Sequence, residues 1–229
     1  MNENLPPLQR HGQDQLIPFL WLRRGIGAMG FFFPIILVAG AMLFGNCNIL
    51  LGSLSDYYHT IMRDVFVAVL CIIAIFLFSY RGPEKKDSIA ANLACLFALG
   101  IAFFPDSIKE DQLSCLICKV KTYSLLHNIS SVAFFLVLSY FSLVLFPKTK
   151  KGVTPTRQKL QRNIIYKITG YLMLVCILII VLYVFFGDTI SGLKNIPVIF
   201  IFEWLALWAF GISWIIKGEW FLEDKVIVA

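Results

Sequence analysis

The sequence predicts an all-α fold: a polytopic membrane helix bundle with six transmembrane helices and both termini in the cytoplasm. Of the 229 residues, 59% are hydrophobic and 15% charged, whereas soluble domains average about 45–50% and about 25%. Six separate stretches approach the roughly 20 apolar residues that cross a bilayer. Lys and Arg are concentrated in alternate connections between those stretches. This composition excludes a soluble globular fold, a disordered chain and a nucleic-acid-binding module.

Each apolar stretch is interpreted as one membrane helix. The stretches cover residues 25–45, 62–80, 89–105, 125–146, 164–187 and 196–216. The connections between them are too short to form a separate soluble domain. We therefore expect a single membrane domain over residues 25–216, an amino-terminal tail over 1–24 and a carboxyl-terminal tail over 217–229.

The first stretch has an alternative interpretation as a signal peptide. Arg23 and Arg24 precede it, and Ala39-Gly40-Ala41 is typical of a cleavage site. Its apolar run is longer than the roughly 7–15 residues usual in such peptides. We therefore expect the first span to be retained.

The third stretch carries alanine at four-residue steps, at positions 90, 94, 98 and 102. Small residues at this spacing let helix backbones approach closely. The pattern predicts a central, tightly packed helix, and the alternative is that alanine is simply common in membrane helices.

The distribution of positive charge sets the expected orientation. Fifteen of the 20 Lys and Arg residues lie on the side that holds both tails and the connections near 81–87 and 147–163. Because Lys and Arg accumulate in cytoplasmic loops, we place both termini in the cytoplasm. Trp21, Trp214 and Trp220 fall at cytoplasmic ends, where indole rings favour the headgroup region.

The connection near 147–163 is the most basic segment of the chain. Its cations are Lys148, Lys150, Lys151, Arg157, Lys159 and Arg162. Such a run attracts anionic lipid headgroups, or it acts only as a determinant of topology. Basic membrane flanks account for the net charge of +6, so membrane lipids are the expected partners and nucleic acid is not.

Three of the six cysteines, Cys47, Cys115 and Cys118, fall in connections on the outer side. An oxidising outer face favours a disulfide among them. The spacing of Cys115 and Cys118 is also that of a zinc half-site, but no second pair completes it. The sequence leaves open which two of the three are joined.

The segment over residues 53–66 is unusually polar for the start of a membrane helix. Treated as one helix, it places Asp56, His59 and Arg63 within about 60° of one another. Asp64 occupies the adjoining arc. Ionisable residues at this depth are costly and are functional candidates by default.

Two other stretches bring ionisable groups to the same side. His127 opens the fourth stretch with Ser131 beside it, and Glu203 lies about 9 Å inside the sixth. A carboxylate at that depth is either neutral or partnered, and the candidate partners are His59, Arg63 and His127. We therefore expect spans two, four and six to enclose a polar pocket that opens outward. The structural alternative is a set of interhelical bridges that lock the bundle.

The tetrapeptide SLSD over residues 53–56, the six spans and the cytoplasmic termini resemble the Frag1/DRAM/Sfk1 group and related bacterial six-span membrane proteins. The resemblance covers the architecture and a few residues around Ser55 and Asp56, while the Gly and Pro residues of that loop are missing. It implies a non-enzymatic role in lipid binding, sensing or membrane homeostasis. On this basis we expect an integral, multi-pass protein of the bacterial inner (plasma) membrane.

A second hypothesis is a metal-dependent membrane hydrolase that acts on a lipid headgroup or amide. His59, His127 and Asp64, or Glu203 in its place, can hold zinc with one open position for an activated water. The pattern is similar to the alkaline ceramidase and adiponectin-receptor superfamily, which uses three histidines, an aspartate and a serine in a seven-span bundle. This chain has six expected spans and no HxxxH pair, and its third histidine, His11, lies on the opposite side.

Two further classes have less support. Catalysis by Ser53 or Ser55 with His59 and Asp56 lacks a Gly-x-Ser-x-Gly turn. A transporter would show repeated halves or matched broken helices, and a channel would show charge rings or a filter sequence. We therefore expect a protein that binds or senses a lipid or small amphiphile, with its ligand and oligomeric state left open.

Reporter fusions test the expected orientation. A reporter placed at residue 229 and another placed near residue 155 should both behave as cytoplasmic, because both positions lie on the side that is rich in Lys and Arg. Export of the reporter at either position would contradict the orientation.

Overall fold

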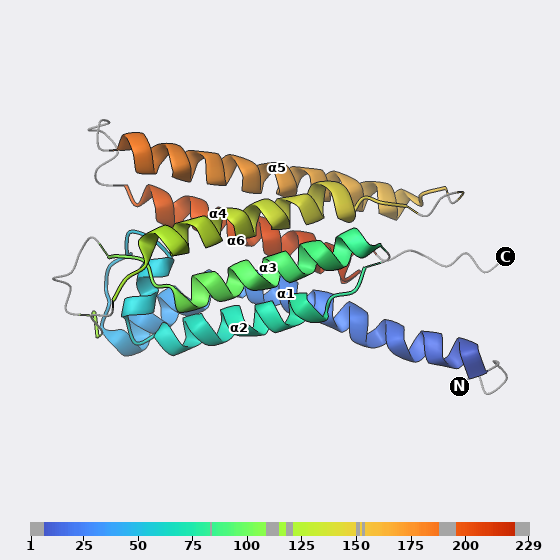
Figure 1. Cartoon of the computed structure of the whole chain (residues 1–229), viewed down its shortest axis with the longest axis horizontal. Helices are drawn as coiled ribbons and strands as arrows, with labels where there is room; N and C mark the ends of the chain where they lie inside the picture. The colour runs from blue at the N-terminus through green and yellow to red at the C-terminus, as the bar shows by residue number, and fades with distance from the viewer. Residues whose placement is uncertain are drawn as a thin grey trace.

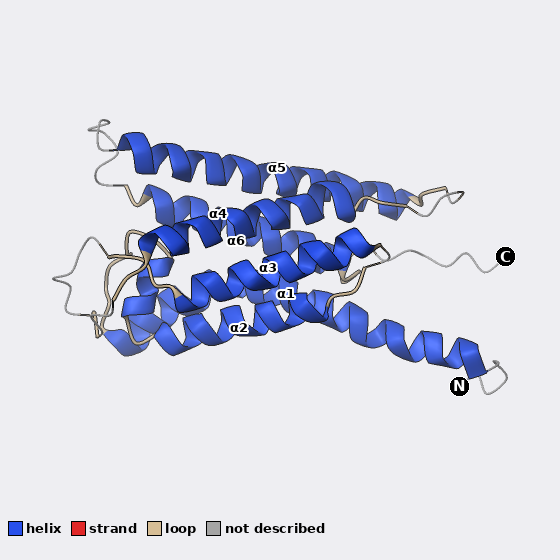
Figure 2. Cartoon of the chain, viewed as in Figure 1, coloured by secondary structure: helices blue, strands red, loops and turns tan. Residues whose placement is uncertain are grey.

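The structure is a computed structural model that describes residues 7–82, 84–108, 115–117, 121–149, 152, 154–187 and 196–222. These residues form an all-helical bundle without strands (Figures 1 and 2). The long helices are α1 (Pro7–Gly45), α2 (Arg63–Ser79), α3 (Lys85–Phe103), α4 (Ser124–Tyr140), α5 (Arg157–Phe186) and α6 (Val198–Lys217). A short 3₁₀ helix, η1 (Ser55–His59), precedes α2, and a π-helical segment, η2 (Phe141–Leu145), continues α4.

Five of these helices are long and apolar enough to cross a membrane, namely α1 from Leu20 onward, α3, α4 with η2, α5 and α6. The remaining helix, α2, has 17 residues and is therefore about 26 Å long. Each of the six apolar stretches of the sequence lies on a helix. The all-α class is confirmed for the described residues, and five helices of membrane-spanning length support an integral membrane protein.

α1 and α5 begin well before the starts that the hydropathy pattern predicts. α1 starts at Pro7, so much of the expected tail over residues 1–24 is helical; proline is well suited to a first helical position, where no N–H is needed. α5 starts at Arg157, inside the expected basic connection. Its start is set by Thr156, whose Oγ1 accepts a hydrogen bond of 3.0 Å from the backbone N of Lys159.

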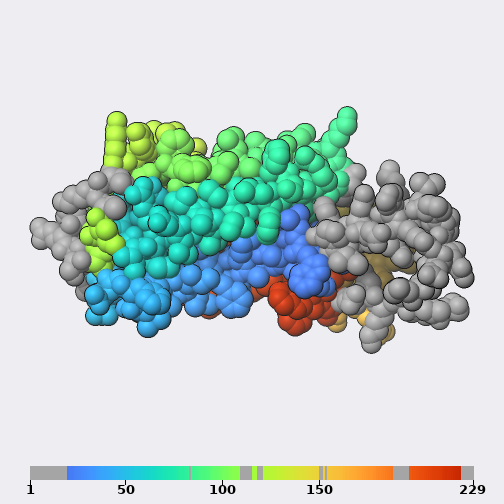
Figure 3. Space-filling view, turned by 90° about the horizontal axis from the view of Figure 1, so that it is seen from below, coloured from blue at the N-terminus to red at the C-terminus, as the bar shows by residue number. Residues whose placement is uncertain are grey.

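Helices that follow one another in the sequence pack side by side, and α1 closes the bundle against α6. Short connections favour this order, because the chain returns next to the helix that it has just left. Figure 3 shows one side of the resulting ring, where α1 lies between α2 and the end of α6. α3 packs between α2 and α4 in the same ring, so its prediction as the central helix is wrong.

The alanine face of α3 is nevertheless buried. Ala90, Ala94, Ala98 and Ala102 are at most 5% exposed. Small side chains at four-residue steps therefore do face neighbouring helices, as the spacing predicts.

α1 and α6 meet at glycines. A Cβ on Gly211 would lie 2.7 Å from the backbone N of Phe31 and 2.8 Å from the carbonyl O of Gly27. A Cβ on Gly27 would lie 2.6 Å from the backbone N of Ile215. Beside this contact, Trp208 Nε1 donates a hydrogen bond of 3.1 Å to the carbonyl O of Phe31. The glycines therefore bring the two backbones into direct contact, which is how helices associate where apolar burial contributes little.

The two ends of the bundle differ in character. The disulfide end holds η1 and the bonded pair Cys47–Cys115. The basic end is where α6 finishes and where Arg24 of α1 contacts the turn after α6. Figure 1 shows that α1 begins and α6 finishes at the basic end.

Trp214 lies at the basic end but does not reach the surface. It is fully buried and packs against the rings of Tyr80, Phe141 and Phe146. Its expected role as an interface anchor is therefore wrong, because the indole fills the space between helices. Trp21 and Trp220, by contrast, are 64% and 53% exposed.

Replacing Gly211 with alanine should destabilise the bundle. Alanine normally favours a helix over glycine by about 1 kcal/mol, but here the added Cβ has no room against α1, and overpacking of this kind costs about 1–3 kcal/mol. Thermal unfolding in detergent should therefore show a lower midpoint for Gly211→Ala. Gly25→Ala is the matched control, because its Cβ would meet only the side chain of Phe76 at 3.2 Å; equal midpoints for the two variants would contradict the close contact.

Candidate functional site

The polar residues singled out in the sequence gather at the disulfide end. Asp56 and His59 lie on η1, which precedes α2. His127 lies near the start of α4, with the half-buried Ser131 one turn further along the same helix. Glu203 lies near the start of α6. Three separate parts of the chain thus contribute to this end.

The polar segment before α2 is not one continuous helix. Thr60 is extended, with φ −101° and ψ −177°, and separates η1 from α2. Its Oγ1 donates a hydrogen bond to the carbonyl O of Tyr57 at 2.8 Å and accepts one from the backbone N of Met62 at 3.1 Å. The expectation that Asp56, His59 and Arg63 share one helical face is therefore wrong, because the side chain of Thr60 competes with helical hydrogen bonding.

Both histidines bind the chain just after α3. His59 Nε2 donates to the carbonyl O of Asp106 at 2.8 Å, and His127 Nδ1 donates to the carbonyl O of Phe104 at 2.8 Å. Each histidine is 3% exposed. Carbonyl groups at the end of a helix have no hydrogen-bond partner within the helix. Here the two imidazoles, which come from η1 and α4, donate to the carbonyl groups that follow α3.

Glu203 binds a backbone amide. Its Oε2 accepts a hydrogen bond of 2.6 Å from the backbone N of Leu54. Two residues earlier, the carbonyl O of Gly52 accepts a hydrogen bond of 3.1 Å from the backbone N of Phe200. The prediction that a histidine or Arg63 would be the partner of Glu203 is therefore wrong. The carboxylate holds the connection before η1 against the start of α6.

Asp56 forms a closed local arrangement with Ser53. Its Oδ2 accepts a hydrogen bond from the backbone N of Ser53 at 2.9 Å, and Ser53 Oγ accepts one from the backbone N of Asp56 at 3.1 Å. Ser53 Oγ also lies 2.8 Å from Ser55 Oγ. Burial, with a smaller contribution from the nearby Asp106, raises the pKa of the Asp56 carboxyl to about 6, although these hydrogen bonds lower it.

Arg63 and Asp64 lie at the first turn of α2, where they do not join Glu203. Arg63 Nη2 donates to Tyr58 Oη at 3.2 Å, and its guanidinium lies 4.9 Å from the centre of the Tyr58 ring. Asp64 is exposed on the same helix. Asp64 is therefore not part of a pocket with the buried histidines.

The ligands expected for zinc are not brought together. Among the described residues, no group of three His, Cys, Asp or Glu side chains is placed to hold a metal ion. His59 and His127 each donate to a backbone carbonyl, and Asp64 is exposed. Within the described part of the chain, the side chains expected to bind zinc therefore do not form the site that the hydrolase hypothesis requires.

One disulfide closes the disulfide end. It joins Cys47, just after α1, to Cys115, in the connection between α3 and α4, with the two Cα atoms 5.1 Å apart. Beyond it, the backbone N of Ile117 donates to the carbonyl O of His59 at 2.9 Å. Cys118, the third candidate, lies outside the described residues. The disulfide and this hydrogen bond tie the connection after α3 to α1 and η1.

A groove that sequence reasoning missed lies between α3 and α4 at the basic end. Its volume is about 340 Å³, and its lining consists of Lys86, Ile89, Ala90, Leu93, Leu136, Val137 and Tyr140. Apart from Lys86 and the Tyr140 hydroxyl, the lining is apolar. The small side chain of Ala90 leaves part of this space open, and Lys86 is exposed. The alanine pattern indicated close packing but gave no sign of a groove.

Several cations of the basic connection bind protein groups. Lys148 Nζ lies 2.9 Å from Glu84 Oε2 and lowers the pKa of that carboxyl. Arg162 is 3% exposed, donates to the carbonyl O of Leu222 at 2.9 Å and pairs with Glu219 at 3.3 Å. The prediction that Arg162 contacts lipid headgroups is therefore wrong, because it is buried against the turn after α6.

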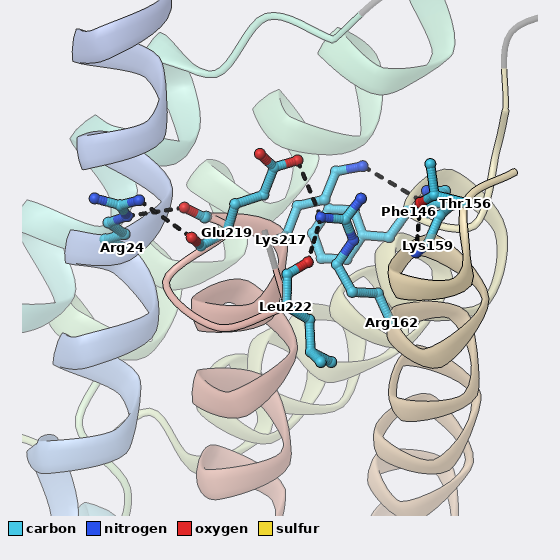
Figure 4. A network of polar contacts seen from close by, with 9 residues as sticks. Arg24, Phe146, Thr156, Lys159, Arg162, Lys217, Glu219 and Leu222 are labelled. Atoms are coloured by element: carbon cyan, nitrogen blue, oxygen red, sulfur yellow. Dashed lines mark hydrogen bonds and ion pairs between the residues drawn. The ribbon is translucent and has the colours of Figure 1, made fainter. Parts of the chain in front are cut away.

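The other cations of that set have different placements. Arg157 is exposed, and Lys159 is half-buried with its Nζ 2.8 Å from the carbonyl O of Phe146. Lys150 and Lys151 lie outside the described residues. Figure 4 shows the network at this end, where Arg24 from α1 and Arg162 from α5 reach the turn after α6 from opposite sides.

No protein-family model, curated protein or solved structure matches this chain. Its function is therefore inferred from the geometry of the two ends of the bundle and of the groove.

Replacing Asp56 with asparagine should stabilise the protein at pH 7.5. The folded-state pKa of about 6 lies above the ordinary value of 3.8 for this carboxyl, so the folded protein binds this proton more tightly than the unfolded chain. Stability therefore rises as pH falls from about 6 to about 4, and the ionised carboxylate is a cost at neutral pH. Asparagine keeps the acceptor for the Ser53 amide and should add roughly 1–3 kcal/mol at pH 7.5 and little at pH 4.

Thermal unfolding at both pH values measures this effect. Asp64→Asn is the control, because that carboxylate is exposed and its loss should change neither midpoint. A gain for Asp56→Asn that is the same at pH 4 and pH 7.5 would show that the carboxylate is not the cause.

Proposed function

We propose that the chain spans the membrane six times with both termini in the cytoplasm. α2 would be the sixth span: it has 17 residues, near the lower limit for a spanning helix, and it packs between α1 and α3. The Lys and Arg excess lies at the end where α1 begins and α6 finishes, and such an excess marks the cytoplasmic side. The disulfide lies at the opposite end, which would face an oxidising compartment.

We further propose that the protein binds an anionic lipid or a similar amphiphile from the cytoplasmic leaflet. The α3–α4 groove carries this proposal: apolar side chains line it, together with Lys86 from the first turn of α3. About 340 Å³ falls within the usual range for small-molecule sites, roughly 300–1,000 Å³.

The chemistry of the groove matches that of a lipid. An acyl chain lying against Ile89, Leu93 and Leu136 would bury apolar surface. A cation near the membrane surface attracts an anionic headgroup by about 1 kcal/mol. Tyr140 adds a hydroxyl at the same level, where aromatic side chains with a polar tip are favoured. The groove would thus select both the chain and the charge of its ligand.

Replacing Lys86 with glutamine should reduce the preference for anionic lipid about fivefold, which corresponds to about 1 kcal/mol. Native mass spectrometry of the purified protein in an equimolar mixture of phosphatidylglycerol and phosphatidylcholine measures this preference. Leu93→Trp, which fills the groove with a larger ring, should reduce the binding of both lipids.

Lys85→Gln is the matched control. It removes the same charge from the neighbouring position, and Lys85 does not line the groove. Equal lipid preference in Lys86→Gln and Lys85→Gln, together with unchanged lipid binding in Leu93→Trp, would contradict the proposed function.

A further inference from the structure

An ion pair joins the two helices between which the groove lies. Glu84 immediately precedes α3, and Lys148 follows η2, the segment that continues α4. Lys148 Nζ donates a hydrogen bond of 2.9 Å to Glu84 Oε2. Figure 1 shows that α3 begins and α4 finishes at the same end of the bundle. The pair therefore bridges α3 and α4 at the basic end.

Both residues of this pair lie within electrostatic reach of the groove lining. Lys86, which lines the groove, acts on the Glu84 carboxylate, and Tyr140, which also lines it, acts on the Lys148 ammonium. Interactions between charges at a protein surface are screened by salt and fall off with distance. The Glu84–Lys148 pair is therefore a neighbour of the residues that would meet the headgroup of the proposed ligand.

The Glu84 carboxylate is itself an anion bound where the groove's ligand would need one. Among the described residues, the cations that act on it come from both helices of the groove, Lys86 on α3 and Lys148 beyond α4. An anionic headgroup that approached Lys86 would meet this carboxylate, and like charges repel. The headgroup and the carboxylate therefore compete for the same cations.

The pair is able to open without disturbing the helix. The side chains of Lys148 and Glu84 are 30% and 53% exposed, and exposed ion pairs contribute little to stability because water and salt screen them. The backbone at Glu84 is held separately, since its N donates a hydrogen bond of 2.8 Å to Oδ2 of the buried Asp87. The Glu84 side chain is thus free to leave Lys148 while the start of α3 stays in place.

We propose that the anionic headgroup of the groove's ligand displaces Glu84 from Lys148 and takes Lys148 as a second cation beside Lys86. This inference rests on the proposed lipid-binding function of the groove and describes how that binding is regulated. In the empty groove the ion pair holds the two helices together at the basic end. In the occupied groove the lipid phosphate binds Lys148, and Glu84 turns toward water. Glu84 is therefore an internal competitor of the ligand.

Calorimetric titration of the full-length protein in neutral detergent with dihexanoyl phosphatidylglycerol tests this competition. Glu84→Gln should raise the affinity roughly threefold, because no ion pair then has to break before the headgroup binds Lys148. In a chain that already carries Lys148→Gln, the same change should leave the affinity unchanged, because no pair remains to be broken. In a chain that carries Glu84→Gln, Lys148→Gln should lower the affinity about fivefold, the contribution of one cation near the membrane surface.

Lys85→Gln provides the matched background. It removes a cation next to Glu84 in the sequence, and Lys85 does not line the groove. Adding Glu84→Gln to this chain should raise the affinity as much as it does in the unmodified protein. The substituted side chains are exposed or half-buried, so these chains should fold, and helical content by circular dichroism checks this.

The size of the Glu84→Gln effect in the two backgrounds decides the outcome. A rise that is the same with Lys148 and with Lys148→Gln would show that Glu84 acts only by repulsion at a distance, and it would overturn the displacement. Absence of any rise would overturn it as well.

Leu93→Trp separates this result from the proposed function. It should weaken phosphatidylglycerol binding to the unmodified chain and to Glu84→Gln alike, because it fills the groove. Binding that Leu93→Trp leaves unchanged would overturn the groove as the lipid site and this inference with it. Binding that Leu93→Trp weakens, together with equal Glu84→Gln effects in the two backgrounds, would overturn the displacement alone.

Discussion

Backbone groups at helix ends need hydrogen-bond partners, and in a membrane the protein has to supply them because lipid cannot. Side chains from neighbouring elements meet this need at both ends of the bundle. His59 and His127 bind the carbonyls that follow α3, and Arg24 binds the carbonyls of the turn after α6. Glu203 accepts the amide of Leu54. These contacts hold each connection against a helix that is distant in the sequence.

The close contact between α1 and α6 depends on a different constraint. Gly27 and Gly211 let the two backbones touch, and this contact closes the ring of helices. The disulfide between Cys47 and Cys115 then fixes the connection after α3 at one end. Between these fixed elements, α3 and α4 are separated near Ala90 by the space that forms the groove.

Polar residues that serve as hydrogen-bond partners of helix ends do not by themselves indicate a functional site. An ionisable residue inside a membrane helix is a functional candidate by default, but Glu203 and the two histidines are explained by the backbone groups that they bind. At the basic end, Lys159 and Lys217 likewise donate to a backbone group, the carbonyl of Phe146.

By itself, the sequence determined where the apolar part of each helix lies, because the hydropathy of about 20 consecutive residues is a local property. It also determined the buried alanine face of α3 and the three cysteines from which the disulfide is drawn. The helical wheel over residues 53–66 failed at Thr60, because it assumed one continuous helix and a side chain ended that helix. Only the tertiary structure decided that the partner of Glu203 is an amide and that Cys47 pairs with Cys115. Such pairings join residues far apart in the chain, and composition and periodicity, which are local, do not specify them.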